Sequence, residues 1–92
     1  MDRKHQEMVE HLMEAIMTLE TAEECFCFFS DLCTSEELTK FARRIQIAKM
    51  ISKGYTYRRI LKETNASNIT ISRLKGVMEK EGSVLSDVVT RI

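Results

Sequence analysis

Side chains able to bind DNA are concentrated in the second half of the chain. Arginine can donate two parallel hydrogen bonds to guanine or to a phosphate, and asparagine can bond adenine through a similar pair. Serine and threonine hydroxyls suit bases or phosphates. The residues of this kind, with one apolar neighbour, are Ser67, Asn68, Ile69, Thr70, Ser72, Arg73 and Lys75. We interpret Arg73 as a contact to guanine or phosphate, and Ile69 as a contact to a thymine methyl group.

Three further cations, Arg58, Arg59 and Lys62, precede this group by one short helix length. In a helix-turn-helix the first helix crosses the DNA backbone while the second enters the major groove. We therefore expect these three cations to contact phosphates rather than bases. Ser67 would begin the second helix, where free backbone N–H groups form a natural phosphate site. Each residue taken alone is also compatible with an ordinary solvated helix surface.

Two short helices joined by a tight turn must position these groups. Thr56 is a suitable cap for the first helix, and Ser67 for the second. Asn65 suits the turn because asparagine tolerates the left-handed conformation. The residues expected to hold the two helices together are Ile60, Thr64, Ala66, Ile71 and Leu74. The segment at about 56–81 therefore has the layout of a helix-turn-helix.

The rest of the chain is also predicted to be helical, so the fold class is all-α. Good helix formers are abundant and proline is absent. The expected helices lie at residues 3–19, from Thr21 to about Cys33, from Thr34 or Ser35 to Lys53, at 57–64, from Ser67 to about Glu81, and from Ser83 through Val89. The apolar stripe of the first helix is wider than one neighbouring helix would cover, which makes a second subunit a candidate cover.

Two of these helices are expected to supply much of the core. In the second helix, dense burial is predicted for Phe26, Phe28, Phe29 and Leu32. In the third helix, the inner face is predicted to comprise Leu38, Phe41, Ala42, Ile45, Ala48 and either Met50 or Ile51.

The charge is unevenly distributed along a chain whose formal net charge is zero. Residues 1–37 hold ten acidic and two basic side chains, a balance of −8. Residues 38–52 have a balance of +4 from four basic side chains, and residues 53–80 hold seven basic and two acidic ones, a balance of +5. A basic second half on an otherwise anionic body fits a nucleic-acid surface, although solvated helices also carry such charge.

Other classes of site find little support in the composition. The cysteines Cys25, Cys27 and Cys33 are odd in number and lack a Cys-x-x-Cys pair, while His5 and His11 lack zinc-ligand spacing. We expect reduced thiols, no metal, and a cytoplasmic protein without a membrane-spanning segment. No histidine is paired with a nucleophile and no carboxylates converge, so an enzyme is not expected.

The residues from Asn65 to Arg73, preceded by Arg44-Ile45-Gln46-Ile47-Ala48 and by Lys53-Gly54, resemble the bacterial Trp repressor family. The stretch from Leu19 to Leu32, followed by Cys33-Thr34, looks closest to its YerC/YecD-type branch. The resemblance implies six helices, an intertwined homodimer and double-stranded DNA as the partner. Residues 1–92 would then form a single Trp-repressor-like DNA-binding domain.

The same resemblance implies an effector pocket that this sequence matches only in part. Thr34, Arg44 and Arg73 match positions that help to hold tryptophan in the true repressor. The family has a glycine directly after the last arginine and a serine three residues further on, where this chain has Leu74 and Val77. These larger side chains would tend to fill the pocket. We therefore expect no cofactor and no response to L-tryptophan.

The sequence thus predicts a sequence-specific DNA-binding transcriptional regulator, acting as a dimeric repressor. The alternative is a ligand-sensing or protein-interaction module that kept the fold without strong DNA binding, which the zero net charge and acidic first half favour slightly.

Overall fold

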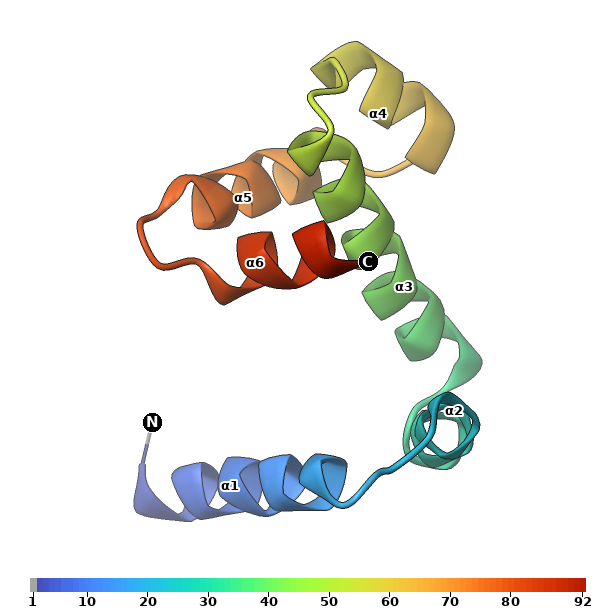
Figure 1. The fold of residues 1–92 in the computed structure, drawn as a ribbon, viewed down its shortest axis with the longest axis vertical. Helices are drawn as coiled ribbons and strands as arrows, with labels where there is room; N and C mark the ends of the chain where they lie inside the picture. Colours follow the sequence, from blue (N-terminus) through green and yellow to red (C-terminus); the bar gives the residue numbers. More distant parts are fainter. Residues whose placement is uncertain (1) are drawn as a thin grey trace. The chain divides into compact units, whose positions relative to one another are not determined.

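The computed structural model describes residues 2–92, and six α-helices connected by short loops make up this part of the chain (Figure 1). Their bounds are α1 Arg3–Met17, α2 Ala22–Leu32, α3 Ser35–Ser52, α4 Tyr57–Thr64, α5 Asn68–Glu79 and α6 Val84–Arg91. The predicted all-α class is confirmed. The chain divides into two compact units, one up to Ser35 and one from Glu36 to Ile92. The single domain expected over residues 1–92 stays a prediction.

In the first unit, both helices begin at side-chain caps. The Asp2 carboxylate accepts a hydrogen bond from the His5 backbone N–H at 2.8 Å and so starts α1. The Thr21 hydroxyl accepts from the Glu24 N–H at 3.0 Å and starts α2. The Glu24 carboxylate in turn accepts from the Glu20 N–H at 3.1 Å, so Thr21 and Glu24 together satisfy two backbone donors at the start of α2.

Burial in the first unit differs from the prediction. Neither α1 nor α2 contains a buried residue, and Phe26 is 64% exposed. Phe28 and Phe29 are half-buried and meet edge to face, with ring centroids 5.2 Å apart. The expectation of a densely buried second helix is therefore wrong for a single chain, because no element of this unit encloses the apolar face of α2.

In the second unit, α4 and α5 are connected through Asn65, Ala66 and Ser67. Asn65 adopts the left-handed conformation expected of it, with φ of 56°. The Thr56 hydroxyl accepts from the Arg59 N–H at 3.2 Å, and this cap begins α4 at the predicted residue. The end of α5 lies at Glu79, two residues before the predicted end, because Lys80 already has an extended conformation with ψ of 139°.

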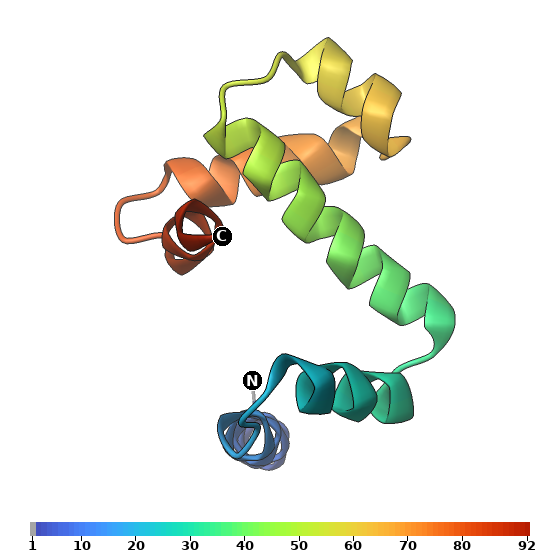
Figure 2. The same cartoon turned by 45° about the vertical axis from the view of Figure 1, so that its right-hand side comes forward.

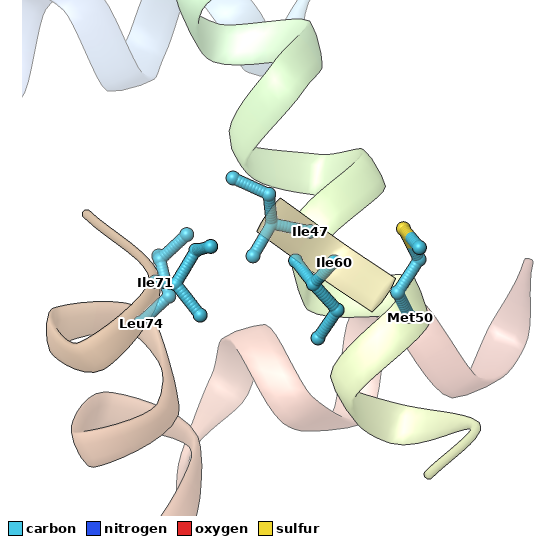
Figure 3. Close-up of a cluster of buried hydrophobic side chains, with 5 residues drawn as sticks. All are labelled: Ile47, Met50, Ile60, Ile71 and Leu74. Atoms are coloured by element: carbon cyan, nitrogen blue, oxygen red, sulfur yellow. The ribbon is translucent and has the colours of Figure 1, made fainter. Parts of the chain in front are cut away.

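The main core of this unit lies where α3, α4 and α5 meet. Its buried members are Ile47, Met50, Ile60, Ile71 and Leu74 (Figure 3). The predicted inner set of α4 and α5 is confirmed, since Thr64 is also buried and Ala66 is half-buried. The buried Thr64 hydroxyl donates to the Ile60 carbonyl at 2.7 Å and accepts from the Ala66 N–H at 3.3 Å. One polar group thereby ties the turn to α4 without an unsatisfied atom.

The inner face of α3 is only partly as predicted. Ala48 and Met50 are buried, but Ile47, which the prediction omitted, is fully buried. Phe41 and Ile45 are 47% and 37% exposed, so their assignment to the core is wrong for a single chain. The reason is that α3 carries apolar residues on two sides, and α4 and α5 cover the side of Ile47 and Met50.

The C-terminal helix α6 packs beside α5 and returns the chain to α3 (Figure 2). A second small core forms there from Ala48, Met78 and Val89. At its end, the Lys49 ammonium donates to the Ile92 carbonyl at 3.2 Å. The α5 helix is therefore held from two directions, which matters because it carries most of the predicted DNA-binding residues. None of the helices within residues 2–92 has the length and apolar character needed to cross a bilayer.

Candidate nucleic-acid interface

The α5 helix buries one side and leaves the opposite side uncovered. Ile71, Leu74 and Met78 are buried at the three- and four-residue spacing of one helical face. The helical period places Ile69, Ser72 and Arg73 on the opposite face, and all three are exposed. Ile69 is 80% exposed, which is high for an isoleucine and leaves its side chain available to a partner.

The three cations of α4 differ in their surroundings. The Arg59 side chain donates to the Glu63 carboxylate at 3.1 Å, and its guanidinium lies 4.1 Å from the centroid of the Tyr55 ring. Arg58 and Lys62 are exposed and form no ion pair within the described residues. Arg58 and Lys62 are thus better placed for phosphates, because the Arg59 guanidinium is already partly engaged by Glu63 and Tyr55.

The hydroxyls of α5 are also distinguished by their contacts. The Ser67 Oγ accepts from the Thr70 N–H at 3.2 Å and lies 3.0 Å from the Thr70 hydroxyl. Ser72 Oγ lies 2.8 Å from the hydroxyl of Tyr57 on α4. Asn68, at the first position of α5, is exposed, and its backbone carbonyl accepts from the same Tyr57 hydroxyl at 2.8 Å. The start of α5 is therefore tied to α4 by polar contacts as well as by the core.

A basic pocket of about 340 Å³ lies beside the turn between α4 and α5. Its lining consists of Lys40, Arg43, Arg44, Asn65, Ala66, Ser67 and Thr70. Three of these residues are cations from α3, and none is acidic. The pocket also includes the N-terminal end of α5, where unpaired N–H groups favour anions. Chemically, this arrangement suits a phosphate.

Two of the three predicted effector residues come together. Arg44 and Arg73 line one pocket of about 190 Å³ together with Ile69, Thr70 and Leu74. The Arg44 guanidinium also lies 5.9 Å from the centroid of the Phe41 ring. Thr34 belongs to the other compact unit, so its part in such a pocket stays a prediction.

Of the two residues expected to obstruct tryptophan, Leu74 lines the pocket of Arg44 and Arg73, and Val77 is not among its lining residues. Leu74 borders the pocket of Arg44 and Arg73, but it is only 4% exposed because most of its side chain packs in the core. Val77 is half-buried.

Lys75 lies toward the opposite edge of α5. It lines a pocket of about 220 Å³ with Tyr55, Tyr57, Ile60 and three other residues of α3, the following loop and α5. This lining is mainly apolar and aromatic, and Lys75 is its one charged member. The predicted DNA-binding residues of α5 thus extend from the side of α3, at Thr70, to the side of α4, at Lys75.

Sequence reasoning gave no role to Lys40, Arg43 or Tyr57. A signal for the two cations was present, because they belong to the run of positive charge at residues 38–52. Nothing in the sequence indicates that this run faces the turn before α5, since the crossing of α3 with the α4–α5 pair decides it. Tyr57 carried no signal, because its partners lie 11 and 15 residues away. Within residues 2–92 no group of three or more His, Cys, Asp or Glu side chains could hold a metal ion.

The sequence of this chain is similar to those of known proteins. The family model described as "Trp repressor protein" matches residues 7–91. The uncharacterized protein YerC of Bacillus subtilis (strain 168) is 42% identical over 74 residues, which cover 80% of this chain and 71% of YerC.

Two crystal structures are similar in fold over most of their length. The first, of a candidate Trp repressor from Staphylococcus aureus, has a TM-score of 0.81 and 43% identity, over 90% of this chain and 83% of that one. The second, of a TrpR-like protein from Eubacterium eligens ATCC 27750, has a TM-score of 0.82 and 34% identity, over 92% of this chain and 88% of that one.

Proposed function

Because this chain belongs to the Trp repressor family, we propose that it is a sequence-specific DNA-binding transcriptional regulator that represses as a homodimer. The observation that carries the proposal is the outer face of α5. Its polar, cationic and apolar groups are exposed, while Ile71 and Leu74 on the opposite face pack in the core. A regulator of this kind needs no catalytic site.

In the proposed complex, α4 and α5 act as a helix-turn-helix. Ile69, Ser72 and Arg73 enter the major groove, where Arg73 can bond guanine and Ile69 can contact a thymine methyl group. Asn68, Thr70 and Lys75 flank them and contact bases or the adjoining backbone. The core contacts support this arrangement, because a helix that reads base edges must be held rigidly against its scaffold.

Phosphate contacts would come from two directions. Arg58 and Lys62, which are free of ion pairs within the described residues, serve one strand from α4, with Arg59 as a weaker contributor. Lys40 and Arg43 serve a phosphate held near Ser67, at the N-terminal end of α5. Such contacts fix the position of the protein on the duplex and make its affinity depend on salt.

The homodimer is supported by uncovered apolar side chains in the first unit. Met8 and Met17 of α1 are 70% and 83% exposed, and Phe26 of α2 is 64% exposed. A second copy of the chain would remove these side chains from water. Two copies would then address half-sites about 34 Å apart on a near-palindromic operator.

The experiment that tests the proposal is selection of bound sequences from a random DNA pool, followed by gel shifts at about 0.1 M salt. We expect one enriched, near-palindromic motif. Arg73→Ala should weaken binding by about 1–3 kcal/mol and relax the base preference at one position of each half-site. Lys62→Ala should weaken binding to all sequences alike.

Arg3→Ala is the matched control for both variants. It removes one positive charge from α1, where the arginine side chain is 94% exposed and lies 3.6 Å from Glu7. It should leave binding close to that of the wild type. Absence of any retained DNA with the wild-type protein would refute the proposal and favour a ligand-sensing or protein-interaction module.

The dimer and the effector have separate tests. Light scattering should give about twice the chain mass of 10.7 kDa, and a species of 10.7 kDa would contradict the dimer. We also propose that L-tryptophan is not the effector, because Leu74 and Val77 stand where the family has glycine and serine.

A further inference from the structure

The Tyr57 hydroxyl connects the first residue of α4 to the first and fifth residues of α5. It lies 2.8 Å from the Asn68 backbone carbonyl and 2.8 Å from Ser72 Oγ. Both distances are typical of good O–H···O hydrogen bonds. Tyr57 itself is half-buried, whereas Ser72 is exposed on the face of α5 proposed to read DNA.

Counting protons settles the direction of both bonds. The tyrosine hydroxyl has one proton, and the carbonyl of Asn68 can only accept. If the Tyr57 proton pointed at Ser72, the phenolic and carbonyl oxygens would face each other at 2.8 Å with no proton between them. The arrangement with one proton in each contact has Tyr57 donating to Asn68, so that Ser72 donates to Tyr57.

The consequence is that Ser72 offers only an acceptor to a partner outside the protein. A free serine hydroxyl rotates and can either donate or accept, so it discriminates poorly among bases. With its proton committed to Tyr57, Ser72 Oγ retains lone pairs alone. In the major groove, adenine N6 and cytosine N4 are donors, whereas guanine O6 and thymine O4 are acceptors.

We propose that Tyr57 is a specificity-determining residue: by accepting a hydrogen bond from the Ser72 hydroxyl, it makes Ser72 select a base with an amino group, adenine or cytosine, at one position of each half-site. Tyr57 acts through Ser72 and is a positioning residue that need not touch DNA. The inference rests on the proposed function, and it assigns one part of its sequence preference to a particular pair of side chains.

The test is a comparison of base preferences, selected from a random pool and then measured by competition on single-base variants of the best site. With the wild-type protein, one position of each half-site should favour adenine or cytosine over guanine and thymine by roughly 2- to 12-fold, the range of one neutral hydrogen bond. With Tyr57→Phe, this preference should fall to less than about twofold, because the freed Ser72 hydroxyl can also donate. Preferences at the other positions should be unchanged.

Two further variants make the result specific. The control is Tyr55→Phe, at a tyrosine two residues away whose hydroxyl forms no hydrogen bond within residues 2–92. This variant should leave every base preference intact. Ser72→Ala should abolish the same preference as Tyr57→Phe, and it serves as the second test if Tyr57→Phe fails to fold. The double variant should show no additional loss.

The outcomes separate the inference from the proposed function. An enriched motif whose adenine or cytosine preference survives either Tyr57→Phe or Ser72→Ala overturns the inference and leaves the proposed function standing. A loss of preference at many positions at once in Tyr57→Phe, with a lowered melting temperature, also overturns it, because that pattern indicates general loosening of α5. If the wild-type protein enriches no sequence, the proposed function and the inference fail together.

Discussion

Two aliphatic side chains of α5, Leu74 and Ile69, should give opposite results when each is shortened to alanine. Leu74 is 4% exposed and packs with Ile47, Ile60 and Ile71, whereas Ile69 is 80% exposed (Figure 3). Both lie on the same helix, so changes in helix propensity affect them similarly. Stability should depend on the first residue and DNA affinity on the second.

The expected size of the Leu74→Ala effect follows from its burial. Truncating a buried leucine removes the transfer free energy of its methyl groups and leaves a cavity, for a total of about 2–5 kcal/mol. Since the whole free energy of unfolding of a small domain is about 5–15 kcal/mol, this is a large part of it. Ile69→Ala should change stability by no more than about 0.5 kcal/mol, because its side chain is already in water.

DNA affinity should respond in the reverse order. If Ile69 contacts a thymine methyl group, its truncation loses roughly 1–2 kcal/mol of apolar burial, at about 0.8 kcal/mol per CH₂. The affinity would then fall roughly 5- to 30-fold. Folded Leu74→Ala should bind more nearly as the wild type does, since Leu74 does not lie on the outer face of α5.

Urea unfolding followed by circular dichroism measures the first effect, and competition gel shifts on the selected site measure the second. All samples need the same protein concentration, because the apparent stability of the proposed dimer would depend on it. A loss below about 1 kcal/mol in Leu74→Ala would refute the assignment of this residue to the core. Equal affinity for Ile69→Ala and the wild type would remove Ile69 from the proposed interface.

Three other predictions concern the turn, a cap and the effector. Asn65→Gly should leave stability unchanged or raise it slightly, whereas Asn65→Ala should lower it by about 1 kcal/mol, since alanine resists the left-handed conformation at φ of 56°; thermal unfolding of both variants measures the difference, and equal melting temperatures would contradict it. Thr56→Ala should lower the free energy of unfolding by about 0.5–2 kcal/mol through loss of the α4 cap, and Thr56→Ser, which keeps the hydroxyl, should restore most of it. Calorimetry with L-tryptophan should detect no binding in the micromolar range, and micromolar affinity would show that Leu74 and Val77 leave the family's pocket open.

The helices and the turn between α4 and α5 could be predicted from the sequence because their causes are local. Thr21, Thr56 and Ser67 each cap the N–H of a residue three positions ahead. Asn65 is the one non-glycine residue with positive φ within residues 2–92, and its residue type already indicated the turn. These interactions span at most a few residues, so they can be read from neighbouring sequence letters.

The placement of α3 could not be predicted in the same way. Both Ile45 and Ile47 are apolar residues of one helix, and the periodicity alone favoured Ile45. Contact with Ile60 and Ile71 decided for Ile47, which is fully buried, while Ile45 remains 37% exposed. A helix with apolar residues on two sides has two faces that could be buried, and only its packing against other helices decides which face is buried.

In the candidate site, too, some features could be predicted from the sequence and others depend on the tertiary structure. Residue types and helical spacing alone determined that α5 would present Ile69, Ser72 and Arg73 outward, since that follows from which residues must be buried. Only the tertiary structure decided that Lys40 and Arg43 face the start of α5, and that the Tyr57 hydroxyl lies 2.8 Å from Ser72 Oγ. Those facts depend on distances between groups remote in sequence or on different helices, and a side chain's chemistry is set by such neighbours as much as by its own type.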